Sequence, residues 1–216
     1  MKDIKKVMIF GDSYSTFAGY IPEGYAVYYS ENERPTTDVR RVEQTWWHSI
    51  CSDMSLELVL NDSWSGSTLG NTGYDGDCSE TSSFICRLER LIDEGFFEKN
   101  EVDTVFVFGC TNDSWAHVPY GEIKLTEQTK EDLFLVCPAV CYFIKKLRET
   151  LPEANIIFII NTGLPAEIVD AIKAASDYNG TEYIELKYID KNFGHPTIKG
   201  MSDIKEQVEE YIKNRR

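Results

Sequence analysis

The stretch KVMIFGDS, residues 6–13, decides the fold. Its first five residues form a short run rich in apolar side chains, and the run stops at a glycine, an aspartate and a serine. A run of that length bounded by turn-forming residues is typical of a buried strand. The sequence therefore predicts a strand at 6–10. Four more runs of this kind predict further strands at 56–60, 103–109, 155–160 and 182–188.

The stretches between the predicted strands have helical periodicity. In the last of them, Ile204, Val208 and Ile212 recur at the spacing of one helix face. Strands that alternate with helices are typical of a parallel sheet whose crossover helices cover both of its faces. We therefore expect an α/β fold in one domain over residues 1–216: a three-layer α/β/α sandwich with a flavodoxin-like, five-stranded parallel sheet. The predicted helices are 43–54, 80–94, 129–150, 165–177 and 198–214.

Composition and charge exclude several classes of function. The 216 residues are 42% apolar and 27% charged, which are ordinary values for a globular protein. The formal net charge of −14 repels phosphate backbones and anionic lipid, so we expect neither nucleic acid nor membrane as a partner. No apolar run approaches the roughly 18 to 20 residues of a membrane span, and the first residues do not resemble a signal peptide. We expect a cytoplasmic protein, or a secreted one if a leader has been removed.

The six cysteines are too sparse and too irregularly spaced for a disulfide framework. Several lie in apolar segments, so we expect reduced thiols in the core. Cys137 and Cys141 lie four residues apart on a predicted helix, but no histidine near them completes a zinc site. We expect no metal and no cofactor.

Polar clusters follow four of the predicted strands. Because the carboxyl ends of parallel strands meet at one edge of a sheet, which is where ligands bind in such folds, we expect these clusters to lie together. The irregular segment 14–42 is a candidate wall for the resulting site, since long loops in small domains are usually functional or mobile. The clusters are Gly11–Ser13, Asn61–Ser67, Gly109–Asp113 and Asp190–Pro196.

A serine at this edge needs three helpers to cleave an ester: a base, donors for the developing oxyanion, and a group that orients the base. His195 is the histidine that lies in a polar loop after a strand, whereas His48 falls in a predicted helix. The backbone N–H groups of Ser13 and Gly66 and the side-chain amide of Asn112 are candidate oxyanion donors. The residues therefore contain a full set for acyl transfer.

These clusters resemble the sequence blocks of the GDSL or SGNH hydrolases. GDSYS carries Ser13 in the position of the family nucleophile, with Asp12 before it, and the glycine block supplies Gly66. GCTND resembles the family's G-x-x-N-D block and supplies Asn112, while GHPTIKGM resembles the histidine block and supplies His195. Four blocks in the family's order, each after the expected strand, are a specific match. The resemblance implies the SGNH fold and a serine esterase or acylhydrolase.

One position departs from the family pattern. Family members commonly carry an aspartate three residues before the histidine, where this chain has Asn192. An asparagine cannot offset the charge of an imidazolium, and its amide can favour the wrong histidine tautomer. Asp190, two residues further back, is the candidate orienter of His195 if the loop bulges. Otherwise Ser13 and His195 act as a dyad in which a backbone carbonyl orients the ring.

Several other interpretations stay open. Taken singly, each block could be an ordinary turn or helix cap. Asn192 favours an inactive ligand-binding module on the same fold, and a transferase would use every catalytic residue of a hydrolase. The resemblance implies a small-molecule ester as the substrate, and a lysophospholipase or a thioesterase is an alternative function. The polar, tyrosine-containing and tryptophan-containing loops favour small acyl groups, such as acetyl on a carbohydrate, and the sequence leaves the oligomeric state open.

Overall fold

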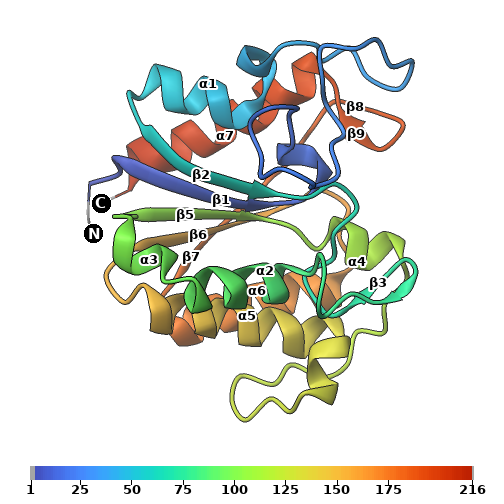
Figure 1. Cartoon of the computed structure of the whole chain (residues 1–216), viewed down its shortest axis with the longest axis vertical. Coiled ribbons are helices and arrows are strands. Elements are labelled where there is room, and N and C mark those ends of the chain that lie inside the picture. The colour runs from blue at the N-terminus through green and yellow to red at the C-terminus, as the bar shows by residue number, and fades with distance from the viewer. Residues whose placement is uncertain (1–2, 216) are drawn as a thin grey trace.

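A computed structural model describes residues 3–215. Five parallel strands form its central sheet in the order β2-β1-β5-β6-β7 (Figure 1). Numbered along the sequence, this is the order 2-1-3-4-5, so the flavodoxin-like arrangement expected from the sequence is confirmed. The strands are β1 (Lys6–Gly11), β2 (Glu57–Ser63), β5 (Thr104–Phe108), β6 (Asn155–Ile160) and β7 (Glu182–Glu185).

Helices cover both faces of the sheet, as predicted (Figure 1). One face carries α1 (Trp46–Asp53) and α7 (Ile198–Asn214). The other carries α2 (Phe84–Asp93), α3 (Phe96–Lys99), α5 (Val136–Thr150) and α6 (Ala166–Asn179). The predicted helix 43–54 begins as a separate short turn, η2 (Val42–Gln44), and the predicted helix 129–150 likewise begins as η3 (Glu131–Phe134).

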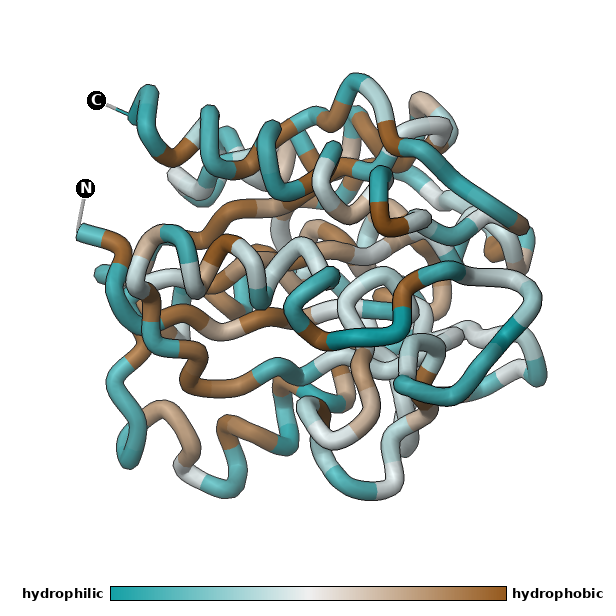
Figure 2. The backbone as a smooth tube through the Cα atoms, turned by 90° about the horizontal axis from the view of Figure 1, so that it is seen from above, coloured by the Kyte–Doolittle hydropathy of each residue, from teal (hydrophilic) through white to brown (hydrophobic). Residues whose placement is uncertain are grey.

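The alternation of side chains along the strands divides the core into two layers. In β6, for example, Ile157 and Ile159 pack toward α1 and α7, whereas Ile156, Phe158 and Ile160 pack toward α2, α5 and α6. All six residues of β6 are buried. Strands that are covered on both faces need apolar residues at every position. This is why the strands appear in the sequence as continuous apolar runs. In Figure 2 the hydrophobic stretches of the tube, in brown, run through the inside of the molecule.

The elements that the sequence did not predict are short. One of them, α3, lies between α2 and β5, and the others lie beyond the carboxyl ends of the strands. They are η1 (Ser13–Ser15), α4 (Thr111–Trp115), and two ribbons, β3 (Thr72–Gly73) with β4 (Gly76–Asp77) and β8 (Lys191–Asn192) with β9 (His195–Pro196). Two-residue strands are too short to show a period. The predicted strand 182–188 likewise ends early, at Glu185.

The described part of the chain has no helix that is both long and apolar enough to cross a membrane. All six cysteines are free thiols, and four of them are buried, as the sequence indicated. Within residues 3–215, no three His, Cys, Asp or Glu side chains are grouped in a way that would hold a metal ion.

Candidate active site

Ser13 lies directly beyond the carboxyl end of β1, at the first position of η1. The short helix begins here because the Asp12 carboxyl accepts a hydrogen bond from the Tyr14 backbone N–H at 3.0 Å. Gly11, the last residue of β1, permits close packing, since a Cβ there would lie 2.3 Å from the Ser63 hydroxyl at the end of β2. Ser13 is therefore presented from a tight turn between two neighbouring strand ends.

His195 is brought to Ser13 by the hairpin β8–β9. Phe193 and Gly194 at the turn both have positive φ, 46° and 79°, as tight two-residue hairpin turns require. Two tyrosines hold the hairpin in place: the Tyr14 hydroxyl donates to the Gly194 carbonyl, and the Tyr29 hydroxyl donates to the Pro196 carbonyl. As a result His195 Nε2 lies 3.0 Å from Ser13 Oγ.

The other ring nitrogen of His195 lies 3.2 Å from the backbone carbonyl oxygen of Phe193. A carbonyl can only accept a hydrogen bond, so Nδ1 carries the proton and the lone pair of Nε2 faces Ser13. Asp190 lies elsewhere: its carboxylate accepts from the Thr197 hydroxyl, and Thr197 caps α7. Of the two arrangements that the sequence left open, the structure has the carbonyl-oriented pair, and Asn192 is the hairpin partner of His195.

The surroundings of His195 favour its neutral form. Burial lowers the pKa of the imidazole, and the positive charges of Arg34 and Lys191 lower it further, while the Phe193 carbonyl opposes this shift. Tyr28 stacks on the ring with centroids 3.6 Å apart and planes inclined by 6°. Tyr28 belongs to the irregular segment 14–42, so the structure places part of this segment beside His195. A neutral imidazole with a free Nε2 is the form that accepts a proton.

Gly66 lies in a turn that follows β2. The Ser67 N–H donates to the Trp64 carbonyl at 3.1 Å, and Gly66 has a φ of +82°, which is the conformation that the third residue of a type II turn requires. The turn is tied to β1 because the Trp64 N–H donates to the Gly11 carbonyl at 3.1 Å. In the described part of the chain, the backbone N–H groups of Ser13 and Gly66 have no hydrogen-bond acceptor.

Asn112 lies on α4, just beyond the end of β5, and its side chain joins the same turn. The amide Nδ2 donates to the Ser67 carbonyl at 3.0 Å, and Oδ1 accepts from the Tyr74 hydroxyl at 3.0 Å. One hydrogen of the amide is left over, since an asparagine amide carries two. The two free backbone N–H groups and this amide hydrogen are the kind of donors that stabilise a developing oxyanion.

The sequence that forms this site matches a known protein family. Residues 5–212 match the family model described as GDSL-like lipase/acylhydrolase. The chain belongs to this family. A solved structure of a candidate GDSL-like lipase from Bacteroides ovatus is 39% identical, with a TM-score of 0.90 over 99% of this chain and 100% of that one. A second, from Bacteroides uniformis, is 39% identical, with a TM-score of 0.89 over 98% and 97%.

Carbohydrate esterases share the fold at greater distance. A family two carbohydrate esterase from Clostridium thermocellum, solved with cellohexaose, has a TM-score of 0.62 at 16% identity, over 97% of this chain and 64% of that one. None of the curated proteins compared matches this chain. Membership of the GDSL-like family makes the chain a hydrolase of the esterase type.

Exposed aromatic side chains surround the site of this GDSL-like hydrolase. The Trp115 ring meets the His195 ring edge-on with centroids 5.6 Å apart, and it is 41% exposed. Phe193 at the hairpin turn is 74% exposed, and Tyr74, which contacts Asn112, is 53% exposed. We call Tyr74, Trp115 and Phe193 the aromatic rim. Sequence reasoning missed it because the three residues come from short elements and turns that lie far apart in the chain.

Lys191 was also missed, although it fixes the hairpin that carries His195. Its ammonium donates to Thr162 Oγ1 at 2.9 Å and to Asn161 Oδ1 at 3.1 Å, beyond the end of β6. Burial lowers the pKa of this lysine. Nothing in the sequence separates Lys191 from the other lysines of the chain, because its partners lie about thirty residues away.

Two acidic residues of the family blocks are buried under the site. Asp113 accepts hydrogen bonds from the N–H groups of Leu69 and Gly70, which oppose the effect of burial, and its pKa is raised to about 6. Burial raises the pKa of Asp12 to about 7, and its Oδ2 atom has no hydrogen-bond partner within residues 3–215. Asp12 therefore supports the turn at Ser13, as its bond to Tyr14 shows, and it does not contact His195.

Proposed function

We propose that this GDSL-like hydrolase is a serine esterase in which Ser13 is the nucleophile and His195 the general base. The observation that carries the proposal is the 3.0 Å contact between Ser13 Oγ and the unprotonated Nε2 of a half-buried histidine. A serine hydroxyl is a weak nucleophile until an adjacent base takes its proton. The Phe193 carbonyl holds the ring in the tautomer that this step needs.

The reaction follows from these positions. As Ser13 Oγ bonds to the ester carbonyl carbon, its proton passes to His195 Nε2, and the carbonyl oxygen becomes an oxyanion. The N–H groups of Ser13 and Gly66 and the amide of Asn112 stabilise that charge. The bond to the alcohol then breaks, and the alcohol leaves with the proton from His195. Water attacks the acyl-enzyme by the same route, which releases the acid and restores Ser13.

The aromatic rim supports small acyl esters of carbohydrates as the substrate class. Flat aromatic side chains beside a polar site can stack on the apolar faces of sugar rings, as they do on other flat groups. Trp115 and Phe193 are exposed on the side of His195, where the alcohol part of an ester would leave. A carbohydrate esterase with the same fold binds cellohexaose, which is compatible with this class.

A comparison of substrates tests the proposal. We expect hydrolysis of p-nitrophenyl acetate to be faster than that of the octanoate ester, and we expect release of acetate from acetylated xylose or glucose. Fluorophosphonate labelling should be confined to Ser13 and absent from Ser13→Ala. A folded protein that neither turns over esters nor becomes labelled would be a binding module, and acetyl transfer to an added alcohol in preference to water would make it a transferase.

The pH dependence has a defined sign. Catalysis needs neutral His195, and protonation removes the base, so activity falls as the pH drops through the pKa of this residue. Because burial, Arg34 and Lys191 lower that pKa from the ordinary value of 6.5, we expect the acidic limb of kcat/KM to lie below pH 6.5. Arg34→Gln should move the limb to higher pH. Lys145→Gln, on α5, is the control that should leave it unchanged, and a wild-type limb above pH 6.5 would contradict this account.

A further inference from the structure

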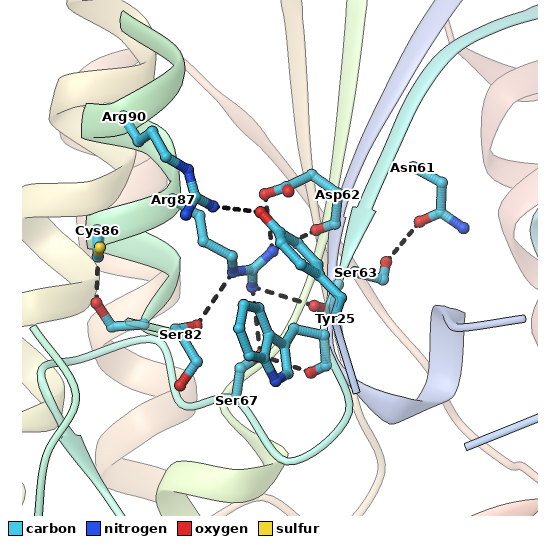
Figure 3. Close-up of polar contacts among 12 residues, drawn as sticks. Tyr25, Asn61, Asp62, Ser63, Ser67, Ser82, Cys86, Arg87 and Arg90 are labelled. Atoms are coloured by element: carbon cyan, nitrogen blue, oxygen red, sulfur yellow. Dashed lines mark hydrogen bonds and ion pairs between the residues drawn. The ribbon is translucent and has the colours of Figure 1, made fainter. Parts of the chain in front are cut away.

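Arg87 on α2 is a fully buried arginine beside the turn that carries Gly66 (Figure 3). Its guanidinium forms an ion pair with the Asp62 carboxylate, at 2.8 Å, and both side chains are almost completely excluded from solvent. Phe84 packs against the guanidinium with its ring centroid 4.4 Å away. Neither residue of the pair belongs to the catalytic set proposed above, so the reason for burying two charges here needs an explanation.

The guanidinium joins four separate segments of the chain. It donates to the Gly11 carbonyl at 3.2 Å, to the Ser67 hydroxyl at 3.3 Å and to the Ser82 carbonyl at 3.1 Å, and it also donates to the backbone carbonyl of Asp62. Gly11 lies two residues before Ser13. A planar guanidinium offers five N–H groups in a fixed fork, so one side chain can set the spacing of several acceptors.

Through Ser67, Arg87 reaches the groups that would face the oxyanion. The Ser67 hydroxyl accepts from Arg87 and donates to the Trp64 carbonyl at 2.8 Å, which closes the turn around Gly66. The Ser67 carbonyl in turn accepts from the Asn112 amide. A displacement of Ser67 would therefore move both the Gly66 N–H and the Asn112 amide.

The same turn is held from its other side by the segment 14–42. The Ser65 N–H donates to the Ala26 carbonyl at 2.9 Å, and the Tyr25 ring packs against Trp64 with centroids 4.3 Å apart and planes inclined by 35°. Arg90, one helical turn after Arg87 on α2, donates to the Tyr25 hydroxyl (Figure 3). The turn 64–67 is thus clamped between α2 and the segment that also stacks on His195.

We propose that Arg87 is a positioning residue that sets the geometry of the oxyanion donors relative to Ser13, an inference that rests on the proposed esterase function. Oxyanion donors work only when they are fixed at hydrogen-bonding distance from the charge that develops, and small errors of position remove much of their effect. A buried ion pair adds little to stability compared with well-packed apolar side chains. The function of this pair follows from its contacts: Arg87 binds Gly11, two residues before Ser13, and Ser67, the residue after Gly66.

The test separates positioning from mere stability. Arg87→Lys keeps a positive charge for Asp62 but lacks the fork that reaches Gly11 and Ser67 together. We expect kcat for p-nitrophenyl acetate to fall by about 10- to 100-fold with KM within about twofold of wild type, less than the 10²- to 10³-fold loss of a whole oxyanion donor. Arg148→Lys is the matched control: Arg148 also joins several carbonyls, at the opposite end of the sheet, and should lose only thermal stability.

A double-mutant cycle with Asn112→Ala provides the decisive readout. If Arg87 acts through the oxyanion donors, Arg87→Lys should lower kcat at least fivefold less in the Asn112→Ala background than in the wild type, whereas its effect on thermal stability should be the same in both. Equal kcat effects in the two backgrounds, or a wild-type kcat in folded Arg87→Lys, would overturn the proposal.

A second variant, Ser67→Ala, tests the proposal if Arg87→Lys does not fold. Ser67→Ala leaves the ion pair intact and removes the contact from Arg87 to the turn, so it should lower kcat with KM retained and should couple to Asn112→Ala in the same way. A wild-type kcat in Ser67→Ala would overturn the proposal. The esterase mechanism and the role of Arg87 fail on different results. An inactive, unlabelled wild type would contradict the esterase mechanism. An active wild type whose double-mutant cycle is additive would contradict only the role of Arg87.

Discussion

Replacing Ser13 with alanine is expected to lower kcat for p-nitrophenyl acetate by about 10⁴- to 10⁶-fold, and His195→Ala by a similar factor, since nucleophile and base act as one unit. For the same reason the double variant should be no slower than either single one. Ser13 Oγ and His195 Nε2 are 3.0 Å apart, and no other base within the described residues contacts Ser13 Oγ. Steady-state and single-turnover kinetics on folded variants measure the effect.

Asp190→Ala and Asn192→Ala are the matched controls for this prediction. Both residues lie in the His195 hairpin region, but the Asp190 carboxylate contacts Thr197 and the orienting atom of His195 is the Phe193 carbonyl. Each control should keep kcat within about threefold of wild type, because a substitution that leaves the base oriented removes no transition-state contact. A loss of 10³-fold or more in Asp190→Ala would show that the hairpin rearranges into a triad when substrate binds.

Removing the amide of Asn112 is expected to lower kcat by about 10²- to 10³-fold, as the loss of one oxyanion donor does in other serine hydrolases. The charge that Asn112 would stabilise exists in the transition state and not in the bound ester, so KM should change little. Because Asn112 also holds the Ser67 carbonyl, part of the loss reflects the displaced turn.

Asn100→Ala provides the comparison for Asn112→Ala. Asn100 caps the end of α3 through a bond to the Phe96 carbonyl, on the far side of the molecule from Ser13. Its replacement should leave kcat unchanged. If Asn112→Ala raised KM by the same factor by which it lowered kcat/KM, its amide would bind the ground state, and its assignment to the oxyanion would be wrong.

The sheet could be predicted from the sequence because strands buried on both faces must be apolar at nearly every position. The runs at 6–10 and 155–160 have this character, and they correspond to β1 and β6. The strand predicted at 182–188 was too long, because Leu186 is buried although it lies beyond the last residue of β7. Burial makes a residue apolar whether or not it belongs to a strand, so the pattern alone does not locate the end.

The candidate site was predictable only where its residues stand in recognisable blocks at strand ends. Ser13, Gly66, Asn112 and His195 could be predicted as candidates on this basis, and the fold brings their blocks together at one edge. The orienting group of His195 could not be identified, since every residue has a backbone carbonyl and only the hairpin turn aims that of Phe193. Arg87 and Asp62 are 25 residues apart, and nothing local in the sequence marks their pairing.

The carbonyl that orients His195 also affects how this protein tolerates genetic change. An aspartate in that role can be lost through one substitution, but no substitution of Phe193 removes its backbone oxygen. An inserted or deleted residue in the hairpin would instead shift the register between Asn192 and His195 and turn the oxygen away. Over evolutionary time, we expect the side chains at positions 190 and 192 to vary more readily than the length of the hairpin, which stays fixed.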